Sequence, residues 1–358
     1  MTGHVEETAL DLPPIFCPLD PAINAAASRV EERAVEWIHR FPIYGNARER
    51  AWVIGTCSAD FYARFVPWAG EDGLLATSLW VYWGFAFDDQ RSDHGHYSDR
   101  PEEFVPMAAG LQRALERPLP APGDDAFADA LRDIAARFRR LGTPVQFQRF
   151  VAAHRAWLTG VAWQIANKAR GRMPDIDEYL TMRLHSAGGE PTFAMLEIAN
   201  GEEVPAAEMD APAVRALTEM AIMVASLDND RYSLIKELTR HHTEQNLYTV
   251  LLGRTCDTLA EAVHTGTCLR DRVFLRFLRL RERIRPRLST AGRAYVDGLA
   301  YGVKGNAEWG QRVPRYVSRG EDPGPADDGA ITWADRPLDD NPEPLPYPTV
   351  SWWWDPAL

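Results

Sequence analysis

Residues 211–241 of the chain read APAVRALTEMAIMVASLDNDRYSLIKELTRH. The helical pattern of apolar residues in this stretch predicts one long helix. Segments of the same kind follow one another from about residue 20 to residue 318. We find no convincing pair of alternating strands and no internal repeat among them. The sequence therefore predicts an all-α fold.

The second half of this stretch places three oxygen-bearing side chains in one row. Asn229, Ser233 and Glu237 are spaced four residues apart, so they drift by only about 80° around a helix. Amide, hydroxyl and carboxylate oxygens are hard ligands, which suit Mg²⁺ rather than zinc. The alternative is the polar face of a surface helix. That alternative is weakened because the apolar segment MAIMVASL runs directly into the row.

A second stretch, WGFAFDDQRSDHG at residues 83–95, also passes from apolar to acidic residues. In a helix, Val81, Gly84 and Phe85 lie on the same side as Asp88. An unpaired buried carboxylate is costly. The stretch is therefore either a solvated helix end or the wall of an apolar cavity with a carboxylate at its rim.

Two such helices facing each other would make an apolar pocket capped by Mg²⁺ ions. This pattern resembles the class I terpene synthases of the bacterial type. The aspartate run resembles the D-D-x-x-D/E signature of that family, and residues 229–237 match its N-D-x-x-S-x-x-K-E form. The family also has a diphosphate-sensing arginine 46 positions before the asparagine, where this chain has Arg183. An Arg-Tyr pair near the end of the last helix corresponds to Arg315 and Tyr316.

The resemblance implies a single-domain helical bundle of the class I terpenoid synthase type with a central apolar active-site cavity. It implies an Mg²⁺-dependent terpene cyclase that ionises farnesyl or geranylgeranyl diphosphate, cyclises the carbocation to a sesquiterpene or diterpene, and releases diphosphate. Three Mg²⁺ ions are expected. The implied metal ligands are Asp88, Asn229, Ser233 and Glu237, and the implied diphosphate contacts are Arg183, Lys236, Arg315 and Tyr316.

The aspartate motif departs from the family pattern in one respect. The last acid of the motif usually comes four residues after the first, whereas Asp93 comes five residues after Asp88. In a regular helix Asp93 therefore shares the face of Asp89. We expect Asp89 and Asp93 to hold arginines as the site closes, with metal binding as the alternative role.

The stretch RLHSAGGEPTF at residues 183–193 predicts a broken helix, because glycine weakens a helix and Pro191 has no N–H to donate within one. A break leaves backbone carbonyls unpaired. In the family, such a break links the sensing arginine to a carbonyl aimed at the reacting carbon of the substrate. By position, Ser186 links Arg183 to Ala187, and Ala187 supplies this effector carbonyl. The resemblance therefore counts Ala187 among the catalytic residues, with Asp88, Arg183, Arg315 and Tyr316. The alternative is an ordinary joint between two helices.

The expected cavity lining consists of Val81, Gly84, Phe85, Phe193 and Trp309. Several of the aromatic residues Trp83, Phe85, Phe87, Trp163 and Phe193 would present π faces to a carbocation. Sesquiterpene cyclases are the commonest bacterial members of the family, which slightly favours the C15 substrate. Gly84 favours the C20 substrate, because the family usually has a bulky residue there. The product skeleton cannot be predicted.

Composition limits the classes of partner. The chain has 358 residues, is 46% hydrophobic, and carries a net charge of −12. This charge argues against nucleic-acid binding and requires cations to hold an anionic substrate. No apolar run reaches 18 residues, no pattern of a secretory signal is found, and the four cysteines form no disulfide or zinc pattern. We expect a cytoplasmic protein, with the homodimer that is common in the family.

We divide the chain into an N-terminal segment (1–20), the helical cyclase domain (21–318) and a C-terminal tail (319–358) rich in proline, aspartate and tryptophan. Exposed indoles usually find a surface to cover. The tail tryptophans, Trp333 and residues 352–354, therefore predict a tail that docks in part, over the cavity entrance.

Three other functions fit the sequence less well. A chain-elongating prenyl diphosphate synthase would need a second aspartate-rich motif, which the Asn-Ser-Glu row replaces. A non-catalytic isoprenoid-binding protein would not need ligand sets at both metal sites. The histidines at 94, 96, 241 and 242 suggest a metal-dependent hydrolase, but they lack the paired carboxylates of such sites.

Overall fold

A computed structural model describes residues 12–93, 95–117, 125–239, 245–317 and 331–358, without the side chains of residues 235–239 and 317. The side chains of Lys236 and Glu237, both with predicted roles, lie outside the described part. The histidines at 94, 241 and 242 also lie outside it. In the described ranges, no helix combines the length and apolar character needed to cross a bilayer.

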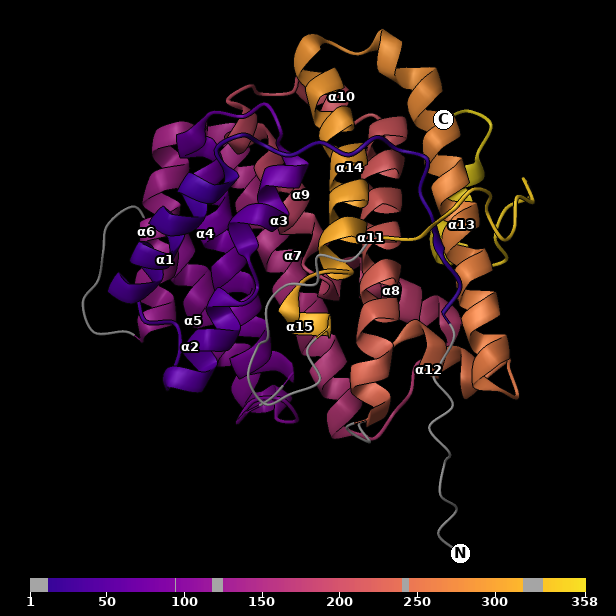
Figure 1. Ribbon diagram of the computed structural model, residues 1–358, viewed down its shortest axis with the longest axis horizontal. Helices are drawn as coiled ribbons and strands as arrows, with labels where there is room; N and C mark the ends of the chain where they lie inside the picture. The colour runs from indigo at the N-terminus through magenta and orange to yellow at the C-terminus, as the bar shows by residue number, and fades with distance from the viewer. Residues whose placement is uncertain (1–11, 94, 118–124, 240–244, 318–330) are drawn as a thin grey trace, which may run out of the picture.

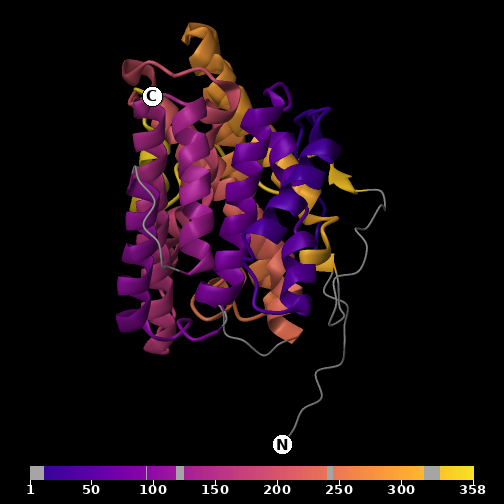
Figure 2. The same cartoon turned by 90° about the vertical axis from the view of Figure 1, so that its left-hand side faces the viewer.

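The structure is a bundle of helices packed side by side (Figure 1 and Figure 2), which confirms the predicted all-α class. The helices are α1 (Ala27–Arg40), α2 (Ala47–Ile54), α3 (Ser58–Phe65), α4 (Glu71–Phe87), α5 (Pro101–Glu116), α6 (Ala126–Leu141), α7 (Pro144–Ala169), α8 (Ile176–Ser186), α9 (Gly189–Asn200), α10 (Ala206–Met209), α11 (Pro212–Thr239), α12 (Leu247–Leu252), α13 (Leu259–Ile284), α14 (Thr290–Gly310), α15 (Pro314–Val317) and α16 (Pro348–Ser351). The 3₁₀ turns are η2 (Arg285–Arg287) and η3 (Trp352–Trp354), and two short strands, β1 (Ile15–Phe16) and β2 (Trp333–Ala334), pair in parallel.

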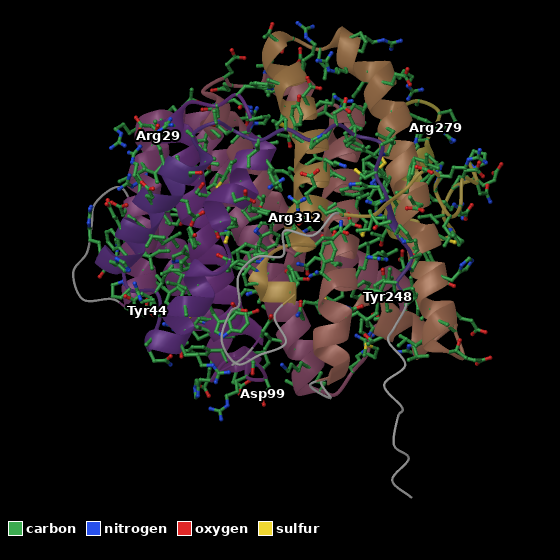
Figure 3. The ribbon with its side chains drawn as sticks, in the orientation of Figure 1. Arg29, Tyr44, Asp99, Tyr248, Arg279 and Arg312 are labelled. Carbon is green, nitrogen blue, oxygen red and sulfur yellow. The ribbon has the colours of Figure 1, made fainter. Side chains whose placement is uncertain are left out.

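Helix α4 lies in the middle of the core. From Gly73 to Phe87 every residue except Phe85 is buried, as expected for a helix that is apolar on all sides. Charged side chains such as Arg29, Asp99 and Arg279 instead lie at the rim of the molecule (Figure 3). Apolar burial therefore holds α4 in place on every side.

Helix α14 approaches its neighbours closely at Gly302. A Cβ atom at this position would lie 2.6 Å from the ring of Phe193 on α9 and 2.7 Å from the ring of Phe65 on α3. Since real Cβ atoms do not approach other atoms so closely, glycine is required here. Both rings are held where they line the cavity described below.

The end of α4 does not continue as a regular helix. Asp88–Asp93 forms a π-helical turn, η1, which is wider than an α-helical turn because its hydrogen bonds join residues five apart rather than four. Asp93 therefore lies with Asp88, and both line the same cavity. The expectation that Asp93 shares the face of Asp89 was wrong, because it assumed a regular helix.

The predicted break between residues 183 and 193 is present. Helix α8 ends at Ser186, Gly188 has the left-handed φ of +72°, and α9 starts at Gly189. A left-handed residue is the usual stop for a helix and favours glycine. The chain turns here without leaving the core.

The described part of the tail docks on the outside of the bundle. Strand β2 lies beside β1, so that Trp333 pairs with Ile15. Trp353 is fully buried, and its indole N–H donates to Glu219 of α11 over 2.9 Å. Thr349 of α16 donates its backbone N–H to Asp177 of α8 over 2.9 Å.

No residue from 331 to 358 lines the cavity. We had expected the tail to cover the cavity entrance, but its described residues do not. It packs against the outer sides of α8, α11 and α13, where buried indole surface is gained without access to the cavity.

Candidate active site

Helices α4 and α11 both descend toward the lower edge of the molecule in Figure 1 and present similar series of side chains. On each helix apolar or small residues come first and oxygen-bearing residues follow at its carboxyl-terminal end. A single cavity lies between these helices and α3, α7, α8, α9, α14 and α15. All five residues predicted to line it do so: Val81, Gly84, Phe85, Phe193 and Trp309.

Several cavity residues were not predicted from the sequence. Trp80 is one helical turn before Gly84, so the spacing that selected Gly84 also pointed to it. Phe61, Phe65 and Trp157 come from segments without any chemical motif, and only the fold brings them here. The remaining lining residues outside the predictions are Gln164, Gly188, Gly189, Thr192, Ala225, Ser226, Asp230, Gln245 and Asn306.

Two of the predicted aromatic residues, Trp83 and Phe87, lie elsewhere. Their rings stack on each other with centroids 5.1 Å apart and pack against Phe127 in the core between α4 and α6. Trp163 is also absent from the cavity lining. Trp83 and Phe87 of α4 belong to the hydrophobic core, and Trp163 of α7 packs against that core, so these three residues serve packing.

The wall formed by α4 and η1 carries the carboxylates of Asp88 and Asp93. The Asp88 side chain keeps 33% of its surface accessible, on the cavity side. The enclosure of Asp88, together with the negative charge of Asp93, raises the pKa of Asp88 well above its usual range. Ser92 donates a hydrogen bond of 2.9 Å to Asp88, which opposes this shift only in part. The carboxylates are short of positive charge.

The opposite wall is formed by α11, where Asn229 and Ser233 both line the cavity. Their spacing of four residues puts them on one face of a regular helix, as predicted. Asn246 holds the same wall from behind, because its amide donates to the backbone carbonyl of Asp230 over 2.8 Å. This wall therefore keeps its shape through ordinary helical geometry.

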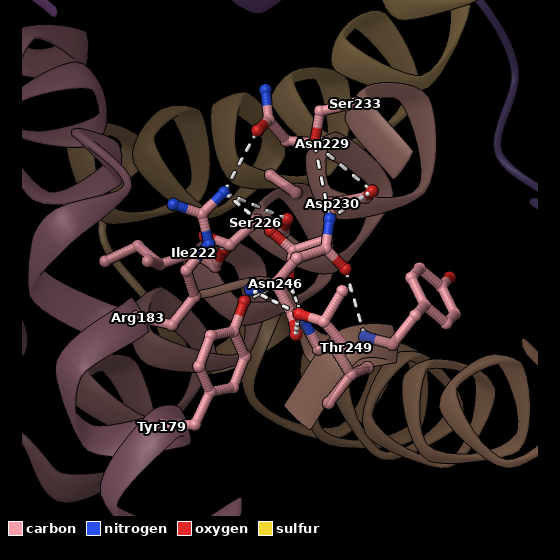
Figure 4. A network of polar contacts seen from close by, with 12 residues as sticks. Tyr179, Arg183, Ile222, Ser226, Asn229, Asp230, Ser233, Asn246 and Thr249 are labelled. Atoms are coloured by element: carbon pink, nitrogen blue, oxygen red, sulfur yellow. Dashed lines mark hydrogen bonds and ion pairs between the residues drawn. The ribbon is translucent and has the colours of Figure 1, made fainter. Parts of the chain in front are cut away.

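Arg183 joins α8 to this wall (Figure 4). Its guanidinium is 2.8 Å from the carboxylate of Asp230 and donates to the amide oxygen of Asn229 over 3.0 Å. Asp230 is buried and also accepts hydrogen bonds from the Tyr179 hydroxyl and from the backbone N–H of Leu247. A buried charge that keeps its partners is stable, whereas loss of one partner is costly. The network fixes Arg183 at the edge of the cavity.

Arg315 and Tyr316 connect the two walls. Arg315 is buried, forms an ion pair with Asp89, lies 3.7 Å from Asp88, and stacks over the ring of Phe85 at 5.0 Å. Its neighbour Tyr316 accepts a hydrogen bond from the amide of Asn229. Asp89 thus holds an arginine, as predicted, while Asp93 forms no ion pair within the described residues. Positive and negative groups alternate around one end of an otherwise aromatic cavity.

The chain is similar to proteins of known function and structure. The family model for terpene synthase family 2, C-terminal metal binding, matches residues 79–271, more than half of the chain. Spiroviolene synthase from Streptomyces violens is 58% identical over 351 residues, which cover 98% of both chains. Phomopsene synthase from Allokutzneria albata is 33% identical over 99% of this chain and 100% of its own. The crystal structure of the SVS_A2 protein, from ancestral sequence reconstruction, superposes with a TM-score of 0.88 at 57% identity, covering 97% of this chain and 99% of that one.

The chain belongs to the bacterial class I terpene synthase family. The sequence resemblance is thereby confirmed, together with the function of a terpene cyclase that acts on a prenyl diphosphate. The chain-elongating alternative is not favoured.

The polar end of the cavity of this terpene synthase fits a divalent metal ion. Its donors are all oxygens, which hard cations prefer, and the raised pKa of Asp88 indicates carboxylates that lack a compensating cation. Among the side chains that the structure describes, no three His, Cys, Asp or Glu residues cluster closely enough to form a metal site by themselves. The candidate set instead combines the carboxylates of one wall with the amide and hydroxyl of the other.

Ser186 and Ala187, at the break between α8 and α9, also line the cavity. The hydroxyl of Ser186 is buried and has no hydrogen-bond partner within the described residues. The carbonyl of Ala187 would normally accept from the N–H of residue 191, which is proline and has none. The break therefore brings polar groups, the Ser186 hydroxyl and the Ala187 backbone, to the lining of the cavity.

Proposed function

We propose that this terpene synthase binds a linear isoprenyl diphosphate with its hydrocarbon chain among the aromatic rings and its diphosphate at the polar end. One observation supports the proposal: oxygen-bearing side chains of α4–η1 and of α11 line one cavity rich in aromatic residues, and the neighbours Arg315 and Tyr316 contact both sets. A chain with an apolar body and an anionic head matches this division of the cavity.

We propose Mg²⁺ as the metal, with three ions, as the family resemblance implies. Asp88 on one wall and Asn229, Ser233 and Glu237 on the other would hold it. Asp93 joins the candidate ligands, because the π turn places it beside Asp88. When bound, the metal supplies positive charge that favours departure of the diphosphate.

The residues of the chain itself then assist the departure of diphosphate. Arg183, Arg315 and Tyr316 are positioned to donate charge-assisted hydrogen bonds to it, and Lys236 keeps this role as a prediction. Donors fixed in advance in a site that excludes water stabilise developing negative charge effectively. Their fixation is supported by the ion pairs with Asp230 and Asp89.

The carbocation left behind would lie among aromatic faces. Phe61, Phe65, Phe85, Phe193 and Trp309 line the cavity and touch one another, with ring centroids 4.6–6.0 Å apart. A cation over such faces is stabilised by their electron density. The same rings exclude water, which would otherwise end the reaction early.

For substrate length we propose geranylgeranyl diphosphate. The three atoms nearest to a Cβ atom at Gly84 would all belong to the ring of Trp80, at 3.6–3.9 Å, which is ordinary van der Waals contact, so a larger residue here would take up space beside Asp88. The 58% identity with spiroviolene synthase also supports a product related to spiroviolene. In this proposal the space at Gly84 outweighs the slight preference for farnesyl diphosphate that family frequencies gave.

The test is incubation with C10, C15, C20 and C25 diphosphates, with and without Mg²⁺, followed by analysis of the hydrocarbons. The expected result is a Mg²⁺-dependent cyclic product from the C20 substrate. The Gly84→Phe variant should suppress C20 turnover and spare or improve C15 turnover. Gly110→Phe is the matched control, because Gly110 lies in the exposed face of α5 with open space around it. Unchanged C20 turnover in Gly84→Phe would contradict the proposed substrate.

A cytoplasmic location and a homodimer stay predictions. Size-exclusion chromatography with light scattering would test the second.

A further inference from the structure

His185 and Glu190 lie on either side of the break between α8 and α9. The imidazole Nδ1 of His185 is 2.9 Å from a carboxylate oxygen of Glu190. His185 belongs to the last turn of α8 and Glu190 to the first turn of α9, where the helix dipole favours an acidic side chain. The pair thus connects the two helix ends across Ala187 and Gly188, which belong to neither helix.

The backbone within the break has little else to fix its orientation. The N–H of Ala187 reaches the Arg183 carbonyl over a long 3.4 Å, and the carbonyl of Ala187 has no N–H at residue 191. The following carbonyl, of Gly188, is by contrast held twice by Thr192, through its N–H at 3.2 Å and its hydroxyl at 2.7 Å. The peptide that follows Ala187 therefore depends on contacts made by the neighbouring side chains.

The ends of the break are packed against two other helices. A Cβ atom at Gly160 of α7 would lie 2.6 Å from both the Cβ of His185 and the backbone nitrogen of Ser186. A Cβ atom at Gly189 would lie 2.8 Å from Ile222 of α11. These contacts limit motion toward α7 and α11. The His185–Glu190 ion pair spans the gap between the two helix ends.

The charges around His185 favour the ion pair. Its hydrogen bond with Glu190, together with the charges of Glu190 and of Glu219 on α11, raises the pKa of His185 above its usual value. Glu219 is itself held by the buried indole of Trp353.

We propose that His185 and Glu190 are a positioning pair that sets the direction of the Ala187 carbonyl in the cavity. This inference rests on the proposed function and on the role that the family resemblance implies for Ala187, a carbonyl aimed at the reacting carbon of the isoprenyl diphosphate. Neither side chain lines the cavity, so the pair acts through the backbone of the break.

The test compares His185→Leu and Glu190→Gln with the wild type at saturating Mg²⁺. Each variant should lower kcat about two- to fivefold, the factor expected for one partly exposed ion pair. KM should stay unchanged, and the share of minor products should rise, because the carbonyl is less well directed. The double variant should lose no more than either single one, since both remove the same interaction. His185→Lys keeps a positive charge beside Glu190 and should recover most of the activity.

The matched control is Arg172→Ala, which removes an ion pair at the opposite end of α8. Arg172 pairs with Glu178 in the first turn of α8, at 2.6 Å and with similar exposure: 49% and 33% of the two side chains, against 41% and 25% for His185 and Glu190. This variant should leave kcat and products unchanged. An equal loss in Arg172→Ala would show that only the stability of α8 matters, and would overturn the proposal.

Arg183→Ala separates failure of this inference from failure of the proposed function. If Arg183→Ala abolishes turnover while the His185 and Glu190 variants match the wild type in kcat and products, the positioning pair is refuted and the proposed function stands. If Arg183→Ala retains full turnover, the proposed function itself fails.

Discussion

The two polar walls of the cavity present similar oxygen-bearing side chains but hold them in different ways. On α11, Asn229 and Ser233 lie one turn apart on a regular helix, fixed from behind by Asp230 and Asn246. On the other wall, the carboxylates of Asp88 and Asp93 come together only because the chain makes a π turn. A ligand set can therefore be built either on regular spacing or on a local irregularity of the helix.

The walls also differ in their balance of charge. The α11 wall has Arg183 beside its carboxylate, at 2.8 Å, whereas Arg315 lies 3.7 Å from Asp88 on the other wall and pairs mainly with Asp89. Asp88 and Asp93 are left close together with little compensation, and the pKa of Asp88 is raised. The negative charge of the α4–η1 wall is thus left for a metal ion to balance. On the α11 wall, Arg183 already balances the carboxylate of Asp230.

The largest expected effect is the loss of one ligand from either wall. Asp88→Asn and Asn229→Leu should each lower turnover by roughly 100- to 1000-fold or more, as removal of a charge-stabilising group does in closed sites. Diphosphate release measures the effect, and circular dichroism checks that the fold is kept. Asp99→Asn, at the exposed rim, is the control and should be silent. Wild-type turnover in either cavity variant would remove that wall from the metal site.

A smaller effect distinguishes the π turn from a regular helix. Asp93→Asn should raise the Mg²⁺ concentration for half-maximal turnover by about tenfold, a typical effect for a group that supports a metal site. Asp89→Asn should instead lower kcat, because it releases Arg315. Titration of activity with Mg²⁺ separates the two outcomes. If Asp89→Asn raises the Mg²⁺ requirement and Asp93→Asn does not, Asp93 lies away from the metal.

The smallest effect on catalysis is expected at the tail. Trp353→Ala should lower the free energy of unfolding by about 3–5 kcal/mol, the usual cost of removing a buried indole, because Trp353 is fully buried. The product distribution should stay the same, since the described tail does not line the cavity. Trp68→Ala, with 82% of Trp68 exposed, is the control for stability. New alcohol products at unchanged stability would restore the idea of a tail that excludes water.

The sequence predicted the features that follow regular periodicity. The all-α class, the faces of α4 and α11, and the five cavity residues all depend on the 3.6-residue repeat, and the structure agrees. The break at Gly188 was predicted from the chemistry of glycine and proline. These predictions succeeded because local backbone preferences and tertiary packing favour the same conformation.

The sequence did not predict what depends on long-range packing. The π turn at Asp88–Asp93 has no signature in residue type, so a regular helix was assumed and Asp93 was misplaced. The rings of Phe61 and Trp157 reach the cavity from segments that carry no motif. The tail tryptophans predicted docking over the cavity entrance, whereas the described tail binds Glu219 and Asp177 on distant helices.

The most direct test of the central claim is a crystal structure of the protein with Mn²⁺ and inorganic diphosphate, in which anomalous scattering locates the metal ions. Our account predicts metal peaks held jointly by Asp88 on one wall and by Asn229 and Ser233 on the other, with diphosphate oxygens in contact with Arg183 and Arg315. Metal peaks confined to one wall, or outside the cavity, would contradict the claim that the two walls form one site.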